Sequence, residues 1–329
     1  MDLNLQEKER SSSSIFVSIV ILAYSERRLV DLKELLNSIE QQTYHLMELV
    51  FVIERSKPIV HYVRDRSSKY PTKIYFSPQK ISVATARNIG VNQSSGDIIA
   101  FLDDDAELTD GWAEHLVSCF LSYPQAIGVT GKIVPRWKHL SDRDCFPKSL
   151  YWMIGCSTWK DSEEIHYTNA TQTLNTAYRK DIFRTNRFAI EQFKDENRGS
   201  LYRGRQGDDI EFAMRATSTS RRKIVYDPSL VVFHKVYSER TAIGFVKRYA
   251  FWQGFTEASY AKDRPSRKGT YSTSARNLLF DMFSIGGNSW QNLRKKFILV
   301  IAVSYFVLGY FSFKSKKMLS LADQCLLNE

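Results

Sequence analysis

Residues 98–105 read Ile-Ile-Ala-Phe-Leu-Asp-Asp-Asp, five apolar residues followed by three aspartates. The run follows the turn-forming residues 94–96 (Ser-Ser-Gly), and an apolar run bounded by turn residues is typical of a buried strand in a parallel sheet. Aspartate is unfavourable within a strand, so we expect Asp103–Asp105 to lie at the carboxyl end of this one. In open α/β sheets that is the edge at which ligands bind.

Three adjacent carboxylates repel one another unless a positive group lies between them. Oxygen ligands of this kind suit Mg²⁺ or Mn²⁺, so Asp103–Asp105 predict a divalent-metal site at the strand end. An acidic loop or a helix N-cap uses the same residue type, and the three aspartates alone do not decide between these interpretations. The choice between a metal site, an acidic loop and a helix N-cap therefore depends on the remainder of the sequence.

Apolar runs alternate with helical periodicities on both sides of this stretch. The predicted strands cover residues 15–23, 46–53, 73–76, 98–102 and 127–134, and the predicted helices cover 29–39, 59–70, 82–93 and 112–121. This alternation indicates an α/β protein, a Rossmann-like and mostly parallel sheet flanked by helices. Further along, the sequence predicts a strand over 173–179, a helix that begins at Asp208, and two short strands over 223–226 and 230–233.

Charge is distributed unevenly along the 329 residues. The formal net charge is +10, and from Lys262 to the end eleven Lys/Arg face four Asp/Glu. A basic region of this kind indicates a negatively charged partner, either a membrane surface or a nucleic acid. The predicted organisation is a disordered lead over 1–14, a nucleotide-binding and catalytic domain over 15–239, and a helical basic region over 240–329.

The basic region contains a 17-residue apolar run over 297–313, flanked by Arg294-Lys295-Lys296 and by further lysines. Seventeen residues is the lower limit for a membrane-spanning helix. The run therefore predicts a membrane-inserted or interfacial helix, with a helix in an oligomer interface as the alternative. The oligomeric state is left open.

The four cysteines have no CxxC spacing, so their pattern indicates neither a zinc site nor a disulfide framework. Residues 1–14 are polar and contain no apolar core of the kind that secretory signals have. Together these features predict a cytoplasmic protein, located at the cytoplasmic face of the membrane.

Five segments, in this order, resemble glycosyltransferase family 2, a group of inverting enzymes with the GT-A fold. They are 17–24 (VSIVILAY), 84–90 (ATARNIG), 96–105 (GDIIAFLDDD), 175–179 (NTAYR) and 207–212 (GDDIEF). The resemblance extends over roughly residues 16–260 and implies the transfer of a sugar from a nucleotide-sugar donor, with Mg²⁺ or Mn²⁺, to an acceptor hydroxyl.

The resemblance also implies roles for individual residues. The base of the donor would lie against Ala23, Tyr24 and Glu26, and its ribose and phosphates would lie near Arg87 and Asn88. Asp103 would contact the ribose or nucleoside, and Asp104 would assist either Asp103 or Asp105. Asp105 would hold the metal, with His234 as a further ligand. Asp209 would be the general base, with Asp208 beside it. Arg203 and Arg205, on the preceding loop, would close over the phosphates.

One departure affects the identity of the donor. Many family members have an aspartate pair after the second strand, whereas this chain has Glu54 and Arg55, so Glu54 would take over the contact with the base. A UDP-sugar and a GDP-sugar both remain candidates.

The acceptor is expected to be a sugar or a lipid-linked glycan, because residues 146–156 resemble family members that act on lipid-linked glycans and the basic apolar C-terminus agrees. The alternatives are a sugar-phosphate nucleotidyltransferase and a non-catalytic protein that binds a nucleotide sugar or a membrane. We expect no nucleic-acid partner, because the positive charge lies with apolar sequence.

Overall fold

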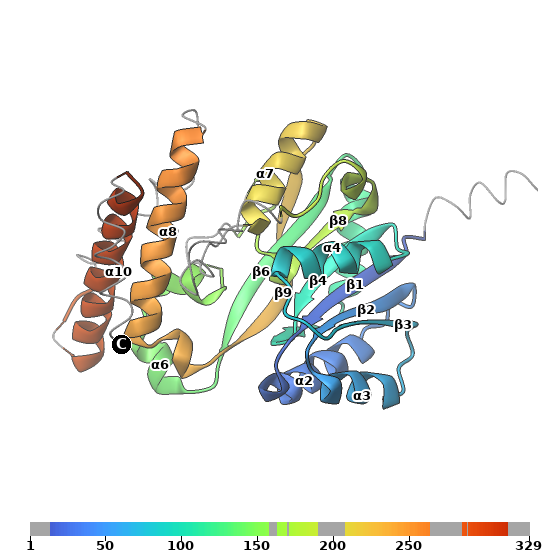
Figure 1. Cartoon of the computed structure of the whole chain (residues 1–329), viewed down its shortest axis with the longest axis horizontal. Helices are drawn as coiled ribbons and strands as arrows, with labels where there is room; N and C mark the ends of the chain where they lie inside the picture. Colours follow the sequence, from blue (N-terminus) through green and yellow to red (C-terminus); the bar gives the residue numbers. More distant parts are fainter. Residues whose placement is uncertain are drawn as a thin grey trace, which may run out of the picture. The chain divides into compact units, whose positions relative to one another are not determined.

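The computed structural model describes residues 14–157, 163–169, 171–189, 208–263, 285–287 and 289–314. The chain divides into two compact units (Figure 1). Unit 1 comprises Met1–Val134, Ser162–Ile190 and Asp208–His234, and unit 2 comprises Pro135–Asp161, Glu191–Gly207 and Lys235–Glu329. The predicted lead over 1–14 lies outside the described residues except for its last position.

Unit 1 begins with four parallel strands in the order β3-β2-β1-β4. Their bounds are β1 Val17–Ala23, β2 Met47–Glu54, β3 Thr72–Ser77 and β4 Ile98–Asp103, and the helices between them are α2 Leu29–Glu40, α3 Lys57–Asp65 and α4 Val83–Gln93. Figure 1 shows α4 on one side of these strands and α2 and α3 on the other. The predicted parallel α/β arrangement is confirmed because β1, β2 and β4 are buried on both faces, which matches their continuous apolar sequence.

The carboxyl ends of these strands meet at one edge of the sheet. Leu22 of β1 is paired with Asp103 of β4, and Ala23 is paired with Ile53 of β2, one residue before Glu54. Polar residues at the ends of these strands therefore lie at the same edge, where ligands bind in such sheets.

The remainder of the sheet is built from strands that return from later parts of the chain. β8 (Thr176–Arg179) is antiparallel to both β4 and β6 (Gly128–Trp137) and lies between them. β5 (Ala106–Leu108) and β7 (His166–Thr168) pair antiparallel with β9 (Ile224–Val236). The short helices η3 (Thr173–Asn175) and η4 (Lys180–Arg184) flank β8, and α5 (Trp112–Ser122) precedes β6.

β9 corrects one expectation, because the two short strands predicted over 223–226 and 230–233 are one continuous strand. Proline lacks the backbone N–H that a sheet requires, so Pro228 lies at an unfavourable position for a continuous strand. However, Asp227 Oδ1 accepts a hydrogen bond from the backbone N–H of Ser229 at 2.8 Å, and the strand continues past the proline.

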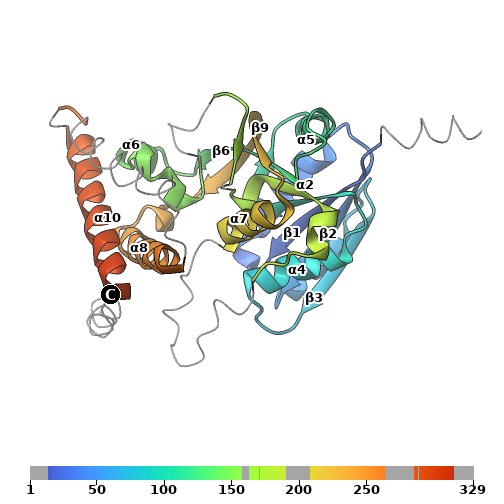
Figure 2. The same cartoon turned by 90° about the horizontal axis from the view of Figure 1, so that it is seen from above.

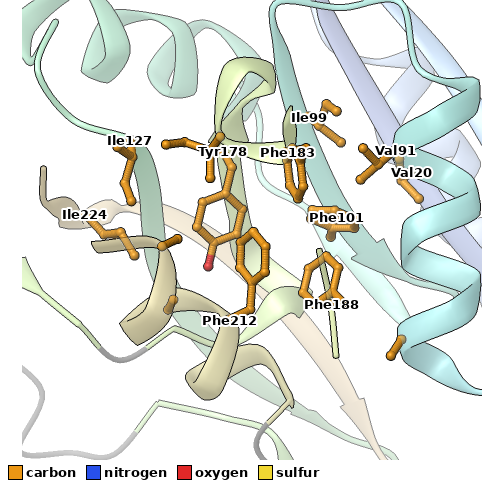
Figure 3. Close-up of a cluster of buried hydrophobic side chains, with 14 of the residues drawn as sticks. Val20, Val91, Ile99, Phe101, Ile127, Tyr178, Phe183, Phe188, Phe212 and Ile224 are labelled. Carbon is orange, nitrogen blue, oxygen red and sulfur yellow. The ribbon is translucent and has the colours of Figure 1, made fainter. Parts of the chain in front are cut away.

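An aromatic cluster forms much of the core of unit 1 (Figure 3). Phe212, from α7 (Asp208–Ser220), stacks on Phe188 and Phe183 with ring centroids 4.3 and 5.2 Å apart, and it meets Tyr178 of β8 edge-on at 5.0 Å. All four rings are almost fully buried. Because Phe212 lies one helical turn after Asp208 and Asp209, this packing fixes the start of α7 against the sheet.

Unit 2 contains α6 (Leu140–Cys145), η2 (Lys148–Ile154), η7 (Ser238–Arg240) and two long helices, α8 (Ile243–Asp263) and α10 (Trp290–Lys314). Figures 1 and 2 show α8 and α10 side by side. Two glycines allow their backbones to touch: a Cβ on Gly254 would lie 2.0 Å from the carbonyl oxygen of Phe306, and one on Gly309 would lie 1.9 Å from that of Phe251. Small residues at such a crossing are typical of tightly packed helix pairs, including those in membranes.

α10 also presents an exposed apolar stripe. The stripe consists of Trp290, Leu293, Phe297, Val300, Val307 and Phe311. These residues recur at alternating steps of three and four, with the polar Ser304 at one position of the series. Among the described helices, α10 is the one that is long and apolar enough to cross a membrane, over Trp290–Phe313. Length and composition alone also allow such a helix in the core of a soluble protein, but 28% of its apolar stretch is buried here.

Candidate functional site

The three aspartates lie at the carboxyl end of β4, where the chain turns sharply into β5. Asp103 is the last residue of β4, and Asp104 and Asp105 are buried in the turn that follows. β5 pairs with β9 so that Ala106 is opposite His234, which brings the buried His234 imidazole beside the turn. Its Nε2 lies 3.3 Å from Asp105 Oδ2.

Arg28 supplies the positive charge at this site. It belongs to η1 (Glu26–Arg28), which follows β1, and its Nη1 lies 2.8 Å from Asp104 Oδ1 and 3.0 Å from Asp105 Oδ2. The guanidinium group also lies 5.3 Å from the ring centre of Tyr24, a cation–π contact. Arg28 was not among the residues predicted from the sequence; the available signal was its position shortly after the first strand.

Burial and mutual repulsion oppose the ionised form of the acids. Burial is the largest cause that raises the pKa of Asp104 to about 7; the charge of Asp105 acts in the same direction, and Arg28 opposes both. Burial and the Asp105 carboxylate also raise the pKa of Asp103, against the opposing charges of Arg87 and His234. The positive groups nearby therefore offset only part of the effect of burial and repulsion on these acids.

The acids and the imidazole fit a divalent cation. Asp104 Oδ2 is buried and has no hydrogen-bond partner in the described part of the chain, so the turn presents a carboxylate oxygen whose hydrogen-bonding capacity is unused. A set of carboxylate oxygens and one imidazole nitrogen suits Mn²⁺. The carboxylate oxygens also suit Mg²⁺. Asp105 and His234, the two residues predicted as metal ligands, are in contact.

A second group of predicted residues meets at η3. Arg87, a buried residue of α4, donates a hydrogen bond from Nη2 to Thr173 Oγ1, and its guanidinium lies over the ring of Phe188. The backbone N–H of Thr173 donates to Asp209 Oδ2 at 3.4 Å, while Asp209 Oδ1 accepts from the N–H of Ile210 at 2.8 Å. Because the charge of Arg87 also acts on Asp103, Arg87 connects the acid cluster to the start of α7. Thr173 was not singled out from the sequence, since a backbone donor leaves no residue-type signal.

The structure gives Asn88 a contact of a different kind. Its amide donates to the carbonyl of Phe188 at 2.9 Å and accepts from the Phe188 N–H at 3.0 Å, so it holds that backbone against α4. The predicted contact between Asn88 and the donor stays a prediction.

The residues predicted for the base pocket lie at or just after the ends of β1 and β2. Ala23 is buried and the ring of Tyr24 is exposed. Glu54 Oε2 accepts from the backbone N–H of Ile81 at 3.1 Å, and Glu26 Oε1 accepts from Ser56 Oγ at 3.3 Å. Arg203, Arg205 and the side chain of Asp208 lie outside the described residues.

Comparison with known proteins identifies a family for this arrangement. The model of the family described as glycosyl transferase family 2 matches residues 18–188, slightly more than half of the chain. The glucosyl-dolichyl phosphate glucuronosyltransferase of Haloferax volcanii is 26% identical over 248 residues, which are 73% of this chain and 76% of that protein.

Solved structures share the fold. TarS 1–349 of S. aureus, crystallised in complex with UDP-GlcNAc, has a TM-score of 0.51 at 12% identity, and the match covers 91% of this chain and 92% of that one. GalNAc-T7, crystallised with UDP, GalNAc and Mn²⁺, has a TM-score of 0.50 at 13% identity; the match covers 79% of this chain and 53% of that one. The predicted GT-A fold is confirmed by these likenesses.

Proposed function

The chain belongs to glycosyl transferase family 2, and we propose that it is an inverting, metal-assisted enzyme that moves a sugar from a nucleotide-sugar donor to a hydroxyl group of a lipid-linked acceptor. Its class, a glycosyltransferase, follows from the family and from relatives with such activity, which sets aside the nucleotidyltransferase alternative. The metal, the stereochemistry, the donor and the acceptor are the proposed parts.

The observation that carries this proposal is the convergence of Arg28 and His234 on the buried Asp105. A nucleoside diphosphate is an anion, so carboxylates bind it only when a cation lies between them. We assign Asp105 and His234 to a divalent cation, Mg²⁺ or Mn²⁺, and Asp103 to the donor's ribose, with Asp104 in support. When bound by these residues, such an ion would act as a Lewis acid and stabilise negative charge on the departing diphosphate.

Residues around the sheet edge complete the proposed donor site. Tyr24 and Glu26 follow β1, and Glu54 is the last residue of β2; with Ala23 we assign them to the nucleotide base of a UDP- or GDP-sugar. Arg87 stays assigned to the donor's ribose and phosphates, which its link to Asp103 supports. Arg203 and Arg205 keep the predicted role of closing over the phosphates.

Asp209 is the proposed general base. Its carboxylate is fixed by two backbone N–H groups, those of Thr173 and Ile210, at the start of a helix that is packed into the core through Phe212. A hydroxyl group is a poor nucleophile until a base accepts its proton, and a positioned carboxylate performs this step. Attack from the face opposite the departing diphosphate inverts the configuration at the anomeric carbon.

Two observations support a lipid-linked acceptor. The Haloferax volcanii relative carries glucosyl-dolichyl phosphate in its name, and α10 presents an exposed apolar stripe next to Arg294, Lys295 and Lys296. Apolar side chains beside basic ones suit the boundary between acyl chains and anionic head groups. We propose that this stripe holds the enzyme at the cytoplasmic face of a membrane.

A thermal-shift panel of nucleotide sugars tests the donor and the metal together. We expect one donor to raise the melting temperature only when Mn²⁺ or Mg²⁺ is present, and a chelator to remove both this shift and the sugar transfer. Asp105→Asn should lose the metal-dependent shift, whereas Asp97→Asn, a change in the loop at the other end of β4, should keep it. Donor binding and transfer that survive chelation would exclude a metal at Asp105.

Vesicle flotation tests the membrane contact. We expect the full chain to float with vesicles of anionic lipid and Val300→Glu to lose at least about tenfold in binding, because inserting a charged side chain costs up to ~3 kcal/mol. Val30→Glu, a change at a similarly exposed valine of α2, should leave flotation unchanged. Val300→Glu protein that still floats would refute the contact, and a dimer that this substitution dissociates would assign the stripe to a second copy of the chain.

A further inference from the structure

Three potential metal ligands meet on unit 1 at a place separate from the acid cluster. His115 and Cys119 are four residues apart on α5, so they share one face of the helix, and Asp227 faces them from β9. Asp227 Oδ2 lies 3.2 Å from His115 Nε2 and 2.8 Å from Cys119 Sγ, and the three ligand atoms all lie within 4.8 Å of one another. We propose that His115, Cys119 and Asp227 form a binding site for Zn²⁺ that joins α5 to β9.

The distances fit a tetrahedral ion. Zinc binds sulfur at ~2.3 Å and nitrogen or oxygen at ~2.0–2.2 Å, so the ligand atoms of a tetrahedral site lie roughly 3.3–3.8 Å apart. Asp227 Oδ2 is 3.2 Å from His115 Nε2 and 2.8 Å from Cys119 Sγ, and all three atoms are within 4.8 Å, so side-chain rotations would admit the ion. Cys119 Sγ donates a hydrogen bond to Asp227 Oδ2 in the metal-free chain, and Zn²⁺ would replace that proton, which passes to solvent.

The ligand types distinguish this site from the one at Asp105. A thiolate and an imidazole favour Zn²⁺ and other borderline-soft ions, whereas Mg²⁺ prefers oxygen ligands alone. Asp227 and His234 are seven residues apart on the same strand, about 23 Å at ~3.3 Å per residue. An ion at Asp227 is therefore too far from His234 to reach a donor there, so this ion is separate from the proposed donor site.

The residues of the proposed zinc site are largely buried, and the carboxylate among them is held in place. Asp227 is 2% exposed, and its other oxygen accepts the N–H of Ser229 at 2.8 Å, which fixes the carboxylate and leaves Oδ2 for the ion. Cys119 is buried, whereas 43% of the His115 side chain is exposed. The exposed side provides a route for the ion and room for a water molecule as the fourth ligand.

Cobalt substitution tests the proposal on the full-length chain. After removal of metals with a chelator, one equivalent of Co²⁺ should produce a near-ultraviolet thiolate-to-cobalt band, and Zn²⁺ should displace it and raise the melting temperature. Cys119→Ser should lack the band and bind Zn²⁺ at least ~100-fold more weakly, since even the loss of a group that only orients a ligand costs 10–100-fold. Cys145→Ser, at a buried cysteine of α6, should behave like the unaltered protein.

His115→Ala provides a second variant, because its half-exposed side chain can be removed without opening the core. It should weaken Zn²⁺ binding by a similar factor and leave the melting temperature of the metal-free protein almost unchanged. Absence of the cobalt band in the unaltered protein, or an identical band in Cys119→Ser, would overturn the proposal. The hydrogen-bonded cluster would then be only a contact between α5 and β9.

Discussion

Asp209→Asn is expected to lower the rate of sugar transfer by ~10²–10⁴-fold, the usual contribution of a general base, while donor affinity changes by less than about twofold. Asparagine has nearly the same shape, and its amide oxygen can still accept one of the two backbone N–H groups that now hold the carboxylate. It cannot accept the proton of the acceptor hydroxyl. The expected loss is therefore in kcat and not in the binding of the donor.

The measurement is transfer to an acceptor at saturating donor, together with the thermal shift that the donor produces. Asp181→Asn, a change at an exposed acid paired with Arg222, provides a matched loss of one negative charge in unit 1 and should leave both quantities unchanged. Turnover at the normal rate in Asp209→Asn would remove Asp209 as the base. Loss of the donor-induced shift would instead place Asp209 in the donor site.

The sequence predicted the parallel half of the sheet well because each of its strands carries its own signal. β1, β2 and β4 are continuous apolar runs, and polar residues mark their carboxyl ends. β9 was predicted less well, since its passage through Pro228 depends on Asp227 accepting the Ser229 N–H and on strands distant in the sequence. The strand propensities of the individual residues do not reflect either of these contacts.

The residues of the candidate site also fall into two groups, those that sequence motifs identify and those that only the fold brings together. Asp103–Asp105, Asp209 and His234 could be selected by motif, and the structure places His234 against Asp105. The partnership of Arg28 with Asp104 joins residues 76 positions apart, and only the fold reveals it. The proposed zinc site was missed for the same reason. Its helical pair was visible in the sequence, but Asp227 lies 108 residues after Cys119.

Arg28→Ala is expected to lower the free energy of unfolding by ~3–5 kcal/mol, the usual cost of removing one partner of a buried ion pair. The Arg28 side chain is 21% exposed and the side chains of Asp104 and Asp105 are 1% exposed, so the substitution leaves two buried carboxylates without this ion pair. Urea denaturation of the metal-free protein measures the loss. Arg27→Ala, a change at the exposed neighbouring residue, is the control and should alter stability by less than about 0.5 kcal/mol.

The same variant tests whether Arg28 and a metal ion compete for the acids. Arg28 Nη1 lies within 3.0 Å of both Asp104 and Asp105, so a cation bound to these oxygens and the guanidinium group cannot both keep these positions. Mn²⁺ should therefore stabilise Arg28→Ala more than it stabilises the unaltered protein, because an ion that binds only the folded state shifts unfolding by mass action. An equal shift in both proteins would mean that the ion and Arg28 use different oxygens. A smaller shift in the variant would make Arg28 a group that helps to assemble the metal site, since the acids would then need the guanidinium group to hold the geometry that the ion requires.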